Sequence, residues 1–224
     1  MASEQDEVRK RRREAEIAAF IKVRLPLVPA SSVPEVLIHA ANPASSLGKL
    51  AELSGEGVAP YWAYPWVGGA SLARHFFARP QTVSGRRVLD FGAGSGLVGI
   101  AAAKCGASKV FASEIDRNAL IALGLNAAAN DVMIELIARD VTKEEPPAVD
   151  LVAAGDVFYD PALAEKAKDF FVRCRAVGVE VIIGDVGRDY LPRDRLRILA
   201  EYPLRDFGDG AGVALKSGRV FSFE

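Results

Sequence analysis

One stretch of the sequence reads Val88-Leu-Asp-Phe-Gly-Ala-Gly-Ser-Gly96 and has the pattern of a buried strand that ends in a glycine-rich loop. The residues from Gly96 to Lys104 are mostly small and apolar, which predicts a helix directly after the loop. Glycines between a strand and a helix let the backbone turn sharply and approach a bound ligand closely. We therefore expect a nucleotide-type binding loop at the carboxyl end of a strand over Arg87–Phe91.

The pattern around this loop alternates strands with helices. Further strands are predicted over Lys109–Glu114, Val132–Ala138, Asp150–Ala154, Val179–Ile183, Pro203–Phe207 and Arg219–Phe223. Helices are predicted over Gly68–Ala78, Gly96–Lys104, Arg117–Ala129 and Arg193–Glu201, and another begins at Asp160 with Pro161 in its first position. Such alternation is typical of an α/β fold with a doubly wound, mostly parallel sheet. We expect seven strands, of which the last two form an antiparallel edge pair.

The first part of the chain differs from the rest in composition. Acidic residues precede the basic run Arg9–Arg13 and apolar residues follow it, which predicts one amphipathic helix over the first two dozen residues. The basic run is either a solvated helix face or a contact for RNA or an acidic partner. Prolines recur between residues 26 and 60, which predicts short elements and not a second core. We divide the chain into an N-terminal helix with a proline-rich lead-in, residues 1–59, and one α/β domain, residues 60–224.

Composition limits the class of protein. The chain has 224 residues, of which half are hydrophobic, and a net charge of −1, so bulk attraction to nucleic acid is not expected. Its apolar runs fall short of the roughly 18 residues that cross a bilayer, and its acid-rich start does not resemble a signal or transit peptide. Two scattered cysteines fit a reducing compartment. We expect a cytoplasmic protein with no membrane contact, and the two histidines predict no metal site because they lack ligand spacing.

Asp90 helps to distinguish between the two classes of ligand that bind at such a loop, dinucleotides and S-adenosylmethionine. Gly94, Gly96 and Gly99 also have the G-x-G-x-x-G spacing of dinucleotide-binding enzymes. A dinucleotide places its pyrophosphate where Asp90 ends the strand, and a carboxylate there is repulsive in a partly desolvated site. S-adenosylmethionine (SAM) instead brings a positive ammonium and a positive sulfonium. The sequence favours SAM, held by Asp90 with Gly92, Gly94 and Gly96, unless Asp90 is only a helix cap or turn former.

Two more acids are placed to bind an adenosine ligand. Glu114 ends the next strand, where a carboxylate accepts hydrogen bonds from both ribose hydroxyls. Ile115 follows it and is included in the predicted cofactor site. Asp140 follows the third strand, where it either accepts from the adenine amino group or serves only as a turn residue. Nicotinamide-dependent enzymes also bind ribose through an acidic residue at this position. Together with Asp90, however, these residues predict that residues 60–224 form a Rossmann-like class I, SAM-dependent methyltransferase domain.

The segment Gly155-Asp-Val-Phe-Tyr-Asp160 follows the fourth strand, at a ligand-facing edge of the sheet. Asp156 and Tyr159 are therefore predicted to lie beside the methyl donor. Enzymes that methylate the amines of bases or of glutamine have an N/D-P-P-Y/F sequence here, and this chain lacks both prolines. An acid that faces an aliphatic amine is a better match than one that faces a planar amide or base.

Two other segments accompany it, Tyr61-Trp-Ala-Tyr-Pro-Trp-Val-Gly-Gly69 and Gly184-Asp-Val-Gly-Arg-Asp-Tyr-Leu-Pro192. From about Pro60 to its end, the chain resembles the seven-β-strand protein-lysine methyltransferases, in particular those that modify the β subunit of electron transfer flavoprotein. The resemblance implies SAM as methyl donor, with Trp66 packed near it. It also implies that Asp156 and Tyr159 border the lysine channel as catalytic residues. The implied partner is a protein that bears the target lysine, either that β subunit or a ribosomal protein.

Several alternatives stay open from the residues alone. Trp62, Tyr64 and Trp66 form an aromatic cluster that either lines a channel for lysine methylenes or belongs to the core. We expect Asp156 to orient the amine and attract its ammonium form, since a carboxylate is too weak a base to hold the proton. The competing functions are methylation of a ribosomal protein or RNA only, SAM binding without activity, and a nicotinamide-dependent oxidoreductase. The last needs a hydride-site constellation such as Tyr-x-x-x-Lys, which we do not find.

Overall fold

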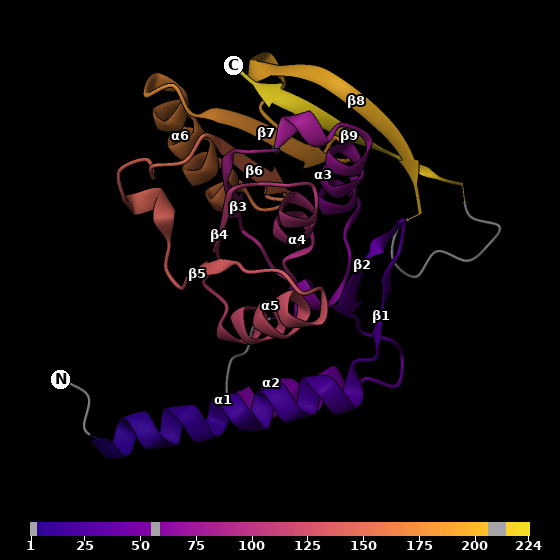
Figure 1. The fold of residues 1–224 in the computed structure, drawn as a ribbon, viewed down its shortest axis with the longest axis vertical. Helices are drawn as coiled ribbons and strands as arrows, with labels where there is room; N and C mark the ends of the chain where they lie inside the picture. Colours follow the sequence, from indigo (N-terminus) through magenta and orange to yellow (C-terminus); the bar gives the residue numbers. More distant parts are fainter. Residues whose placement is uncertain (1–3, 55–58, 206–213) are drawn as a thin grey trace.

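The structure is a computed structural model that describes residues 4–54, 59–205 and 214–224. A seven-stranded sheet lies at its centre (Figure 1). The strands lie in the order β5-β4-β3-β6-β7-β9-β8. The parallel strands are β3 (Arg87–Phe91), β4 (Lys109–Ser113), β5 (Glu135–Ile137), β6 (Leu151–Gly155) and β7 (Glu180–Asp185). β9 (Lys216–Phe223) pairs antiparallel with β7 and with β8 (Leu196–Leu204). The predicted mostly parallel sheet with an antiparallel edge pair is confirmed.

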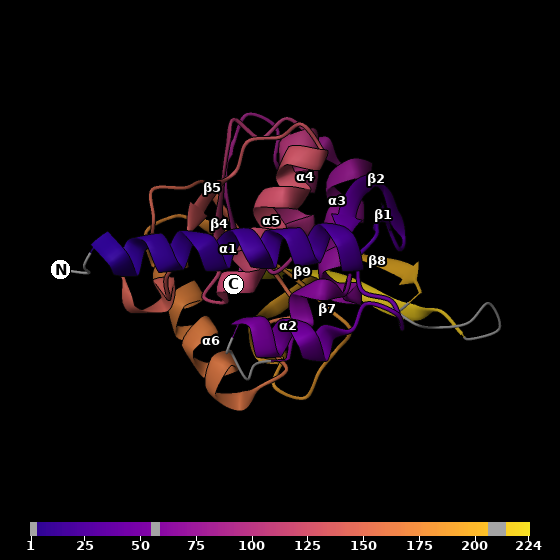
Figure 2. The ribbon, with the colours of Figure 1, turned by 90° about the horizontal axis from the view of Figure 1, so that it is seen from below.

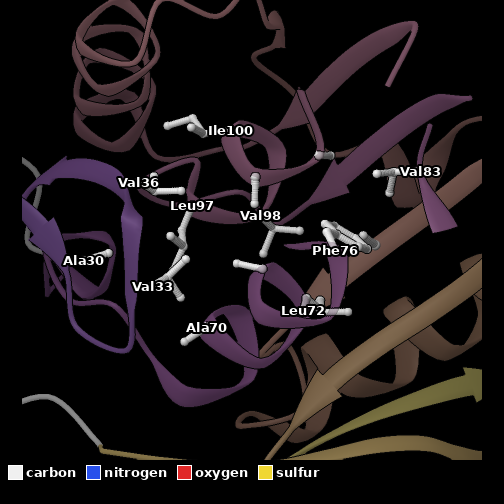
Figure 3. Packing of buried hydrophobic residues seen from close by; sticks show 14 of the residues in the cluster. Ala30, Val33, Val36, Ala70, Leu72, Phe76, Val83, Leu97, Val98 and Ile100 are labelled. Carbon is white, nitrogen blue, oxygen red and sulfur yellow. The ribbon is translucent and has the colours of Figure 1, made fainter. Parts of the chain in front are cut away.

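The two faces of the sheet bury two separate cores because alternate residues of a strand point to opposite sides. Val88 of β3 belongs to the core under helices α3 (Val67–Ala78) and α4 (Leu97–Lys104), where Figure 3 shows Phe76 and Val98. Its neighbour Leu89 belongs to the core under α6 (Pro161–Ala176) on the other face. α5 (Arg117–Ala129) packs Leu123 against Ala112 of β4. Helices on both faces confirm the doubly wound architecture.

The N-terminal part consists of short elements after one long helix, as predicted. α1 (Glu4–Arg24) is followed by the antiparallel pair β1 (Leu27–Ala30) and β2 (Val33–His39), and then by α2 (Leu47–Ser54). Figure 2 shows α1 and α2 side by side across one end of the molecule. Ile17 and Ile21 of α1 pack in one cluster with Trp62 and Ala119. The helix and lead-in therefore cover the α5 side of the domain and share its core.

The basic run on α1 has partners within this N-terminal part. Arg12 pairs with Glu16 one turn further along the helix, and Arg11 pairs with Glu7. Arg13 donates hydrogen bonds to the last backbone carbonyls of α2, those of Leu53 and Ser54. A cation is stabilising at a helix C-terminus, where these carbonyls lack partners in the helix. These contacts favour a solvated helix face that helps to hold α2.

The structure departs from the sequence prediction at one edge of the sheet. The helix predicted over Arg193–Glu201 is wrong, because a single 3-10 turn over Arg193–Arg195 leads directly into β8. β8 lies at the edge of the sheet, and charged and apolar residues mix along it without the alternation that is typical of a strand. Its conformation depends on pairing with β9. The strand predicted over Pro203–Phe207 is the end of β8, up to Leu204. Phe207 and most of the glycine-rich turn after it lie outside the described residues.

The other edge strand, β5, is shorter than the predicted range Val132–Ala138 and pairs only from Glu135 to Ile137. The remaining predicted helices and strands begin and end within one or two residues of the predicted positions, apart from β9, which begins three residues earlier. Among the described helices, none is both long and apolar enough to cross a membrane.

Candidate active site

A cavity of about 850 Å³ opens at the carboxyl ends of β3, β4 and β6. Its lining contains these residues of the predicted site: Trp66, Asp90, Gly92, Gly94, Glu114, Ile115, Asp140, Asp156 and Tyr159. Parallel strands bring their carboxyl ends to one edge of the sheet, which is where an open α/β sheet binds ligands. The structure thus brings together residues that are far apart in the sequence.

Gly96 is the exception among the predicted residues, since it does not line this cavity. It precedes α4 with a φ of 81°, and a Cβ there would come within 2.7 Å of Leu123 on α5. Gly96 therefore serves the turn and the contact between α4 and α5. Gly94, with a φ of 51°, is the glycine whose backbone N–H reaches the acidic residue on the next strand.

Glu114 is held by backbone N–H groups on both oxygens. Oε2 accepts a hydrogen bond from Gly94 at 2.9 Å, and Oε1 accepts from Ile115 at 2.7 Å and from Asp116 at 2.9 Å. Of the roughly four lone-pair sites of a carboxylate, these three bonds leave one on Oε2. The group is therefore fixed at the cavity wall and can accept one further hydrogen bond. Ile115 is exposed and adds an apolar surface beside it.

Asp90 lies deeper, with 1% of its surface exposed. Its Oδ2 accepts a hydrogen bond from the backbone N–H of Gly99 in α4 at 2.8 Å. Burial raises the pKa of Asp90 to about 7, with a smaller contribution from Glu114, although the Gly99 N–H opposes the shift. The helix contact considered for this residue therefore exists, and its carboxylate also borders the cavity. A cation in the cavity would favour its ionised form.

Asp140 makes the local contacts of a turn aspartate. Its carboxylate accepts from the backbone N–H of Thr142 at 3.1 Å and from the Thr142 hydroxyl at 2.5 Å. It begins the 3-10 turn Val141–Lys143 and lines the cavity at the same time. Both interpretations of this residue remain compatible with its position.

Asp156 follows β6 in a left-handed conformation with a φ of 58°. Its Oδ2 accepts a hydrogen bond from the backbone N–H of Gly69, at the start of α3, at 2.7 Å. Its Oδ1 accepts from the Arg188 guanidinium at 2.5 Å. Burial raises the pKa of Asp156, although Arg188 and the Gly69 N–H oppose the shift. Asp156 thus has two partners that the sequence analysis did not predict, but each oxygen keeps a lone pair for another donor.

Arg188 and Asp185 are two residues of the site that the sequence analysis did not identify. Asp185 ends β7 and is fully buried, and its Oδ1 accepts from the backbone N–H groups of Gly187 and Arg188 at 2.7 and 2.8 Å. Its Oδ2 accepts from the Arg188 side chain at 3.0 Å. An acid at a strand end with an arginine three residues later is the signal that could have identified them.

The aromatic residues divide between core and cavity wall. Trp62 is buried in the cluster with α1, and its Nε1 has no hydrogen-bond partner among the described residues. Trp66 donates from Nε1 to the carbonyl of Tyr61 at 2.8 Å, and the two ring centres lie 6.3 Å apart. Tyr61 was not among the predicted site residues, and its ring centre lies 5.8 Å from that of Tyr159. Tyr61, Trp66 and Tyr159 thus form an aromatic wall at the cavity.

The residues at the cavity fit SAM better than a metal ion. The cavity combines a glycine turn, a carboxylate held at the second strand end, a buried acid and the aromatic wall, and Trp62, whose indole N–H is unpaired among the described residues, also lines it. These groups suit a ribose and a cationic ligand. Within the described part of the chain, no group of three or more histidine, cysteine or acidic residues is arranged to hold a metal ion.

Comparisons with known proteins agree with this geometry. A family model described as ribosomal protein L11 methyltransferase (PrmA) matches residues 78–158. The chain is 37% identical over 170 residues to the electron transfer flavoprotein beta subunit lysine methyltransferase of Danio rerio, and 39% identical over 171 residues to that of Xenopus laevis. These matches cover 73% and 74% of this chain. They cover 66% and 70% of those proteins, so the chain spans about two thirds of their length.

Solved structures resemble the fold. Magnesium protoporphyrin IX methyltransferase (ChlM) from Synechocystis PCC 6803, with bound SAM, superposes with a TM-score of 0.51 at 13% identity, over 80% of this chain and 91% of that chain. TrmN from Thermus thermophilus gives 0.52 at 21% identity, over 70% of this chain and 49% of that chain. At such identities the likeness concerns the fold alone, and it is the Rossmann-like class I methyltransferase fold that the sequence predicts.

Proposed function

The chain belongs to the electron transfer flavoprotein β-subunit lysine methyltransferases, and from this premise we propose that it transfers methyl groups from SAM to lysine side chains of a protein. The first candidate substrate is the β subunit of electron transfer flavoprotein, which its relatives are named for. Family membership decides against the nicotinamide-dependent oxidoreductase.

We assign the cofactor to the wall formed by β3, β4 and the loops that follow them. Glu114 accepts a hydrogen bond from a ribose hydroxyl on the one lone pair of Oε2 that its three backbone donors leave free. Ile115 and Asp140 line the same cavity and would border the adenine of bound SAM, and the loop at Gly92 and Gly94 would let the ligand approach the backbone. Asp90 lines the same cavity and would attract the methionine ammonium of bound SAM.

We assign the substrate amine to the wall of Tyr61, Trp66 and Tyr159. Aromatic faces suit the methylenes of a lysine and attract its cation. When bound, SAM supplies an electrophilic methyl group on a positive sulfur. Asp156 accepts a hydrogen bond from the amine and orients its lone pair, so that alignment provides most of the catalysis.

The lysine must lose a proton before it can react. Deprotonation at neutral pH costs about 4.6 kcal/mol for a group with a pKa near 10.4. Asp156 is too weak a base to hold that proton. Partial burial raises the pKa of Tyr159, so its phenol stays protonated at neutral pH. Tyr159 is 54% exposed, which places solvent beside the amine. Water therefore takes the proton.

One observation carries this proposal: in one cavity, Glu114 at the end of β4 and Asp156 at the end of β6 flank the glycine loop after β3. The test is intact-mass analysis of purified electron transfer flavoprotein β subunit after incubation with SAM and this protein. We expect mass gains in steps of one methyl group, with Asp156→Asn as a nearly inactive control that still binds SAM. An unchanged mass with wild-type protein that binds SAM would contradict this substrate.

A ribosomal protein is a second candidate, favoured by the match of residues 78–158 to the ribosomal protein L11 methyltransferase model. Purified L11 incubated under the same conditions tests it. In a second assay, a cell extract is incubated with this protein and methyl-labelled SAM. Labelled material that survives nuclease but is destroyed by protease indicates a protein acceptor. Label that is lost to nuclease would instead indicate RNA.

A further inference from the structure

The loop after β7 places an arginine between two carboxylates at the amine side of the cavity. Nη1 of Arg188 donates to Oδ1 of Asp156 and also to Oδ2 of Asp185, at 2.5 and 3.0 Å. Three segments that are distant in the sequence thereby meet: the end of β6, the end of β7 and, through Gly69, the start of α3.

This contact differs from the surface ion pairs elsewhere in the molecule. The side chain of Arg188 is 23% exposed, and those of Asp156 and Asp185 are 10% and 0% exposed. Removing one partner from such a group leaves buried charge without compensation, which is costly. Without the guanidinium, two nearly buried carboxylates would repel each other across this small space.

The backbone around Asp156 allows little relaxation. A Cβ on Gly68 would come within 2.7 Å of the Asp156 carboxyl carbon, and one on Gly155 would come within 2.7 Å of Gly69. α3 therefore packs closely on the ends of β6 and β7. The carboxylate has Gly69 on one oxygen and Arg188 on the other, so the side chain of Asp156 has one orientation.

We propose that Arg188 is a positioning residue for methyl transfer: it holds the Asp156 carboxylate ionised and in a single orientation for the amine, and Asp185 holds Arg188 in place. This inference rests on the proposed function only in its reference to the amine. The contact itself is present without substrate. Arg188 lines the cavity but acts through Asp156, so it is not itself a catalytic residue.

The charges around Asp156 predict how its titration changes when Arg188 is replaced. The charged groups that act on it are Arg188, which favours the ionised form, and Asp185, which opposes it. α3 contributes the Gly69 N–H on the same carboxylate. Loss of Arg188 leaves burial and Asp185 against ionisation, so Asp156 takes up a proton at a higher pH.

The test compares Arg188→Ala and Arg188→Lys with the matched control Arg193→Ala. Arg193 holds the same loop from outside, through the carbonyl of Gly187 at 2.8 Å, and is exposed. Carbon-13 NMR of aspartate carboxyl groups, with Asp156→Asn to assign the signal, follows the titration in the protein without SAM. We expect its midpoint to rise by about one pH unit or more in Arg188→Ala and to stay near wild type in Arg188→Lys and Arg193→Ala.

Enzyme kinetics supply the second readout. In Arg188→Ala we expect kcat to fall roughly 10- to 100-fold with SAM affinity unchanged, and the acid limb of the kcat/KM profile to move to higher pH. Arg188→Lys and added millimolar guanidinium should each restore part of the activity. An unchanged titration of Asp156 in Arg188→Ala overturns the inference, as does an equal loss of kcat in Arg193→Ala. The titration of Asp156 could shift as expected in Arg188→Ala while the wild-type protein methylates no lysine. That result would contradict the proposed function but would still support the contact between Arg188 and Asp156.

Discussion

The carboxylate of Glu114 accepts a hydrogen bond from the backbone N–H of Gly94 at 2.9 Å. This bond ties the end of β4 to the loop after β3, at the wall of the cavity. Both groups are thereby held in place before a ligand arrives, which lowers the entropy cost of binding.

Replacing Glu114 tests the ribose assignment. Glu114→Ala should weaken SAM binding by about 10-fold or more, because a hydrogen bond to a charged group is lost and Gly94 loses its acceptor. Isothermal titration calorimetry measures the change. Glu165→Ala, on the exposed side of α6 outside this cavity, serves as the control and should bind as wild type. Equal affinities in all three proteins would remove the ribose role from Glu114.

Asp90 should link SAM binding to pH. Its folded-state pKa of about 7 lies above the ordinary value for aspartate, so its contribution to stability is present at low pH and lost as the pH rises through about 7. Positive charge on SAM favours the ionised form, so affinity should rise between about pH 6 and pH 8, with proton release on binding. Calorimetry in buffers of different ionisation enthalpy detects the released proton. Asp90→Asn should flatten this dependence, and an equally steep dependence in that variant would contradict the assignment.

Asp156→Asn should separate cofactor binding from methyl transfer. Asparagine tolerates the left-handed backbone at this position, so the loop is expected to keep its shape. SAM affinity should stay within about 2-fold of wild type, while kcat falls about 100-fold, because the charged acceptor for the amine is gone. Calorimetry and single-turnover assays on one protein preparation measure both. A matched loss of affinity and of kcat would show that Asp156 acts on the cofactor instead.

Tyr159 should act through its ring. Tyr159→Phe keeps the face that lies 5.8 Å from the Tyr61 ring, so KM for the protein substrate should change less than about 3-fold. Tyr159→Ala should raise KM about 10-fold with SAM affinity unchanged, because part of the aromatic wall is lost. Steady-state kinetics at saturating SAM distinguish the two variants. Similar KM values for Tyr159→Phe and Tyr159→Ala would instead show that the hydroxyl group, and not the ring, contributes to substrate binding.

Elements with strong local signals were predictable from the sequence. α5 begins after Asp116, whose side chain accepts from the backbone N–H groups of Asn118 and Ala119, and its bounds match the prediction. β3 matches because a run of buried residues leads into glycines. β8 was not predictable in this way, because its conformation depends on pairing with β9, which lies further along the chain.

The candidate site shows the same division. Acids that end strands, such as Glu114 and Asp156, could be placed because parallel strands share one carboxyl edge. Their partners could not, because the contacts of Arg188 and Gly69 with Asp156 arise from three segments that only the folded chain brings together. The two partners of Asp156 are the main point that the structure adds to the prediction for this residue.

The most direct measurement follows a labelled methyl group from SAM into purified electron transfer flavoprotein β subunit and identifies the modified amino acid after complete hydrolysis. Wild-type protein is expected to yield labelled methyl-lysine, and Asp156→Asn, with SAM bound, to yield almost none. Label recovered in another amino acid, or equal labelling by the two proteins, would contradict the account.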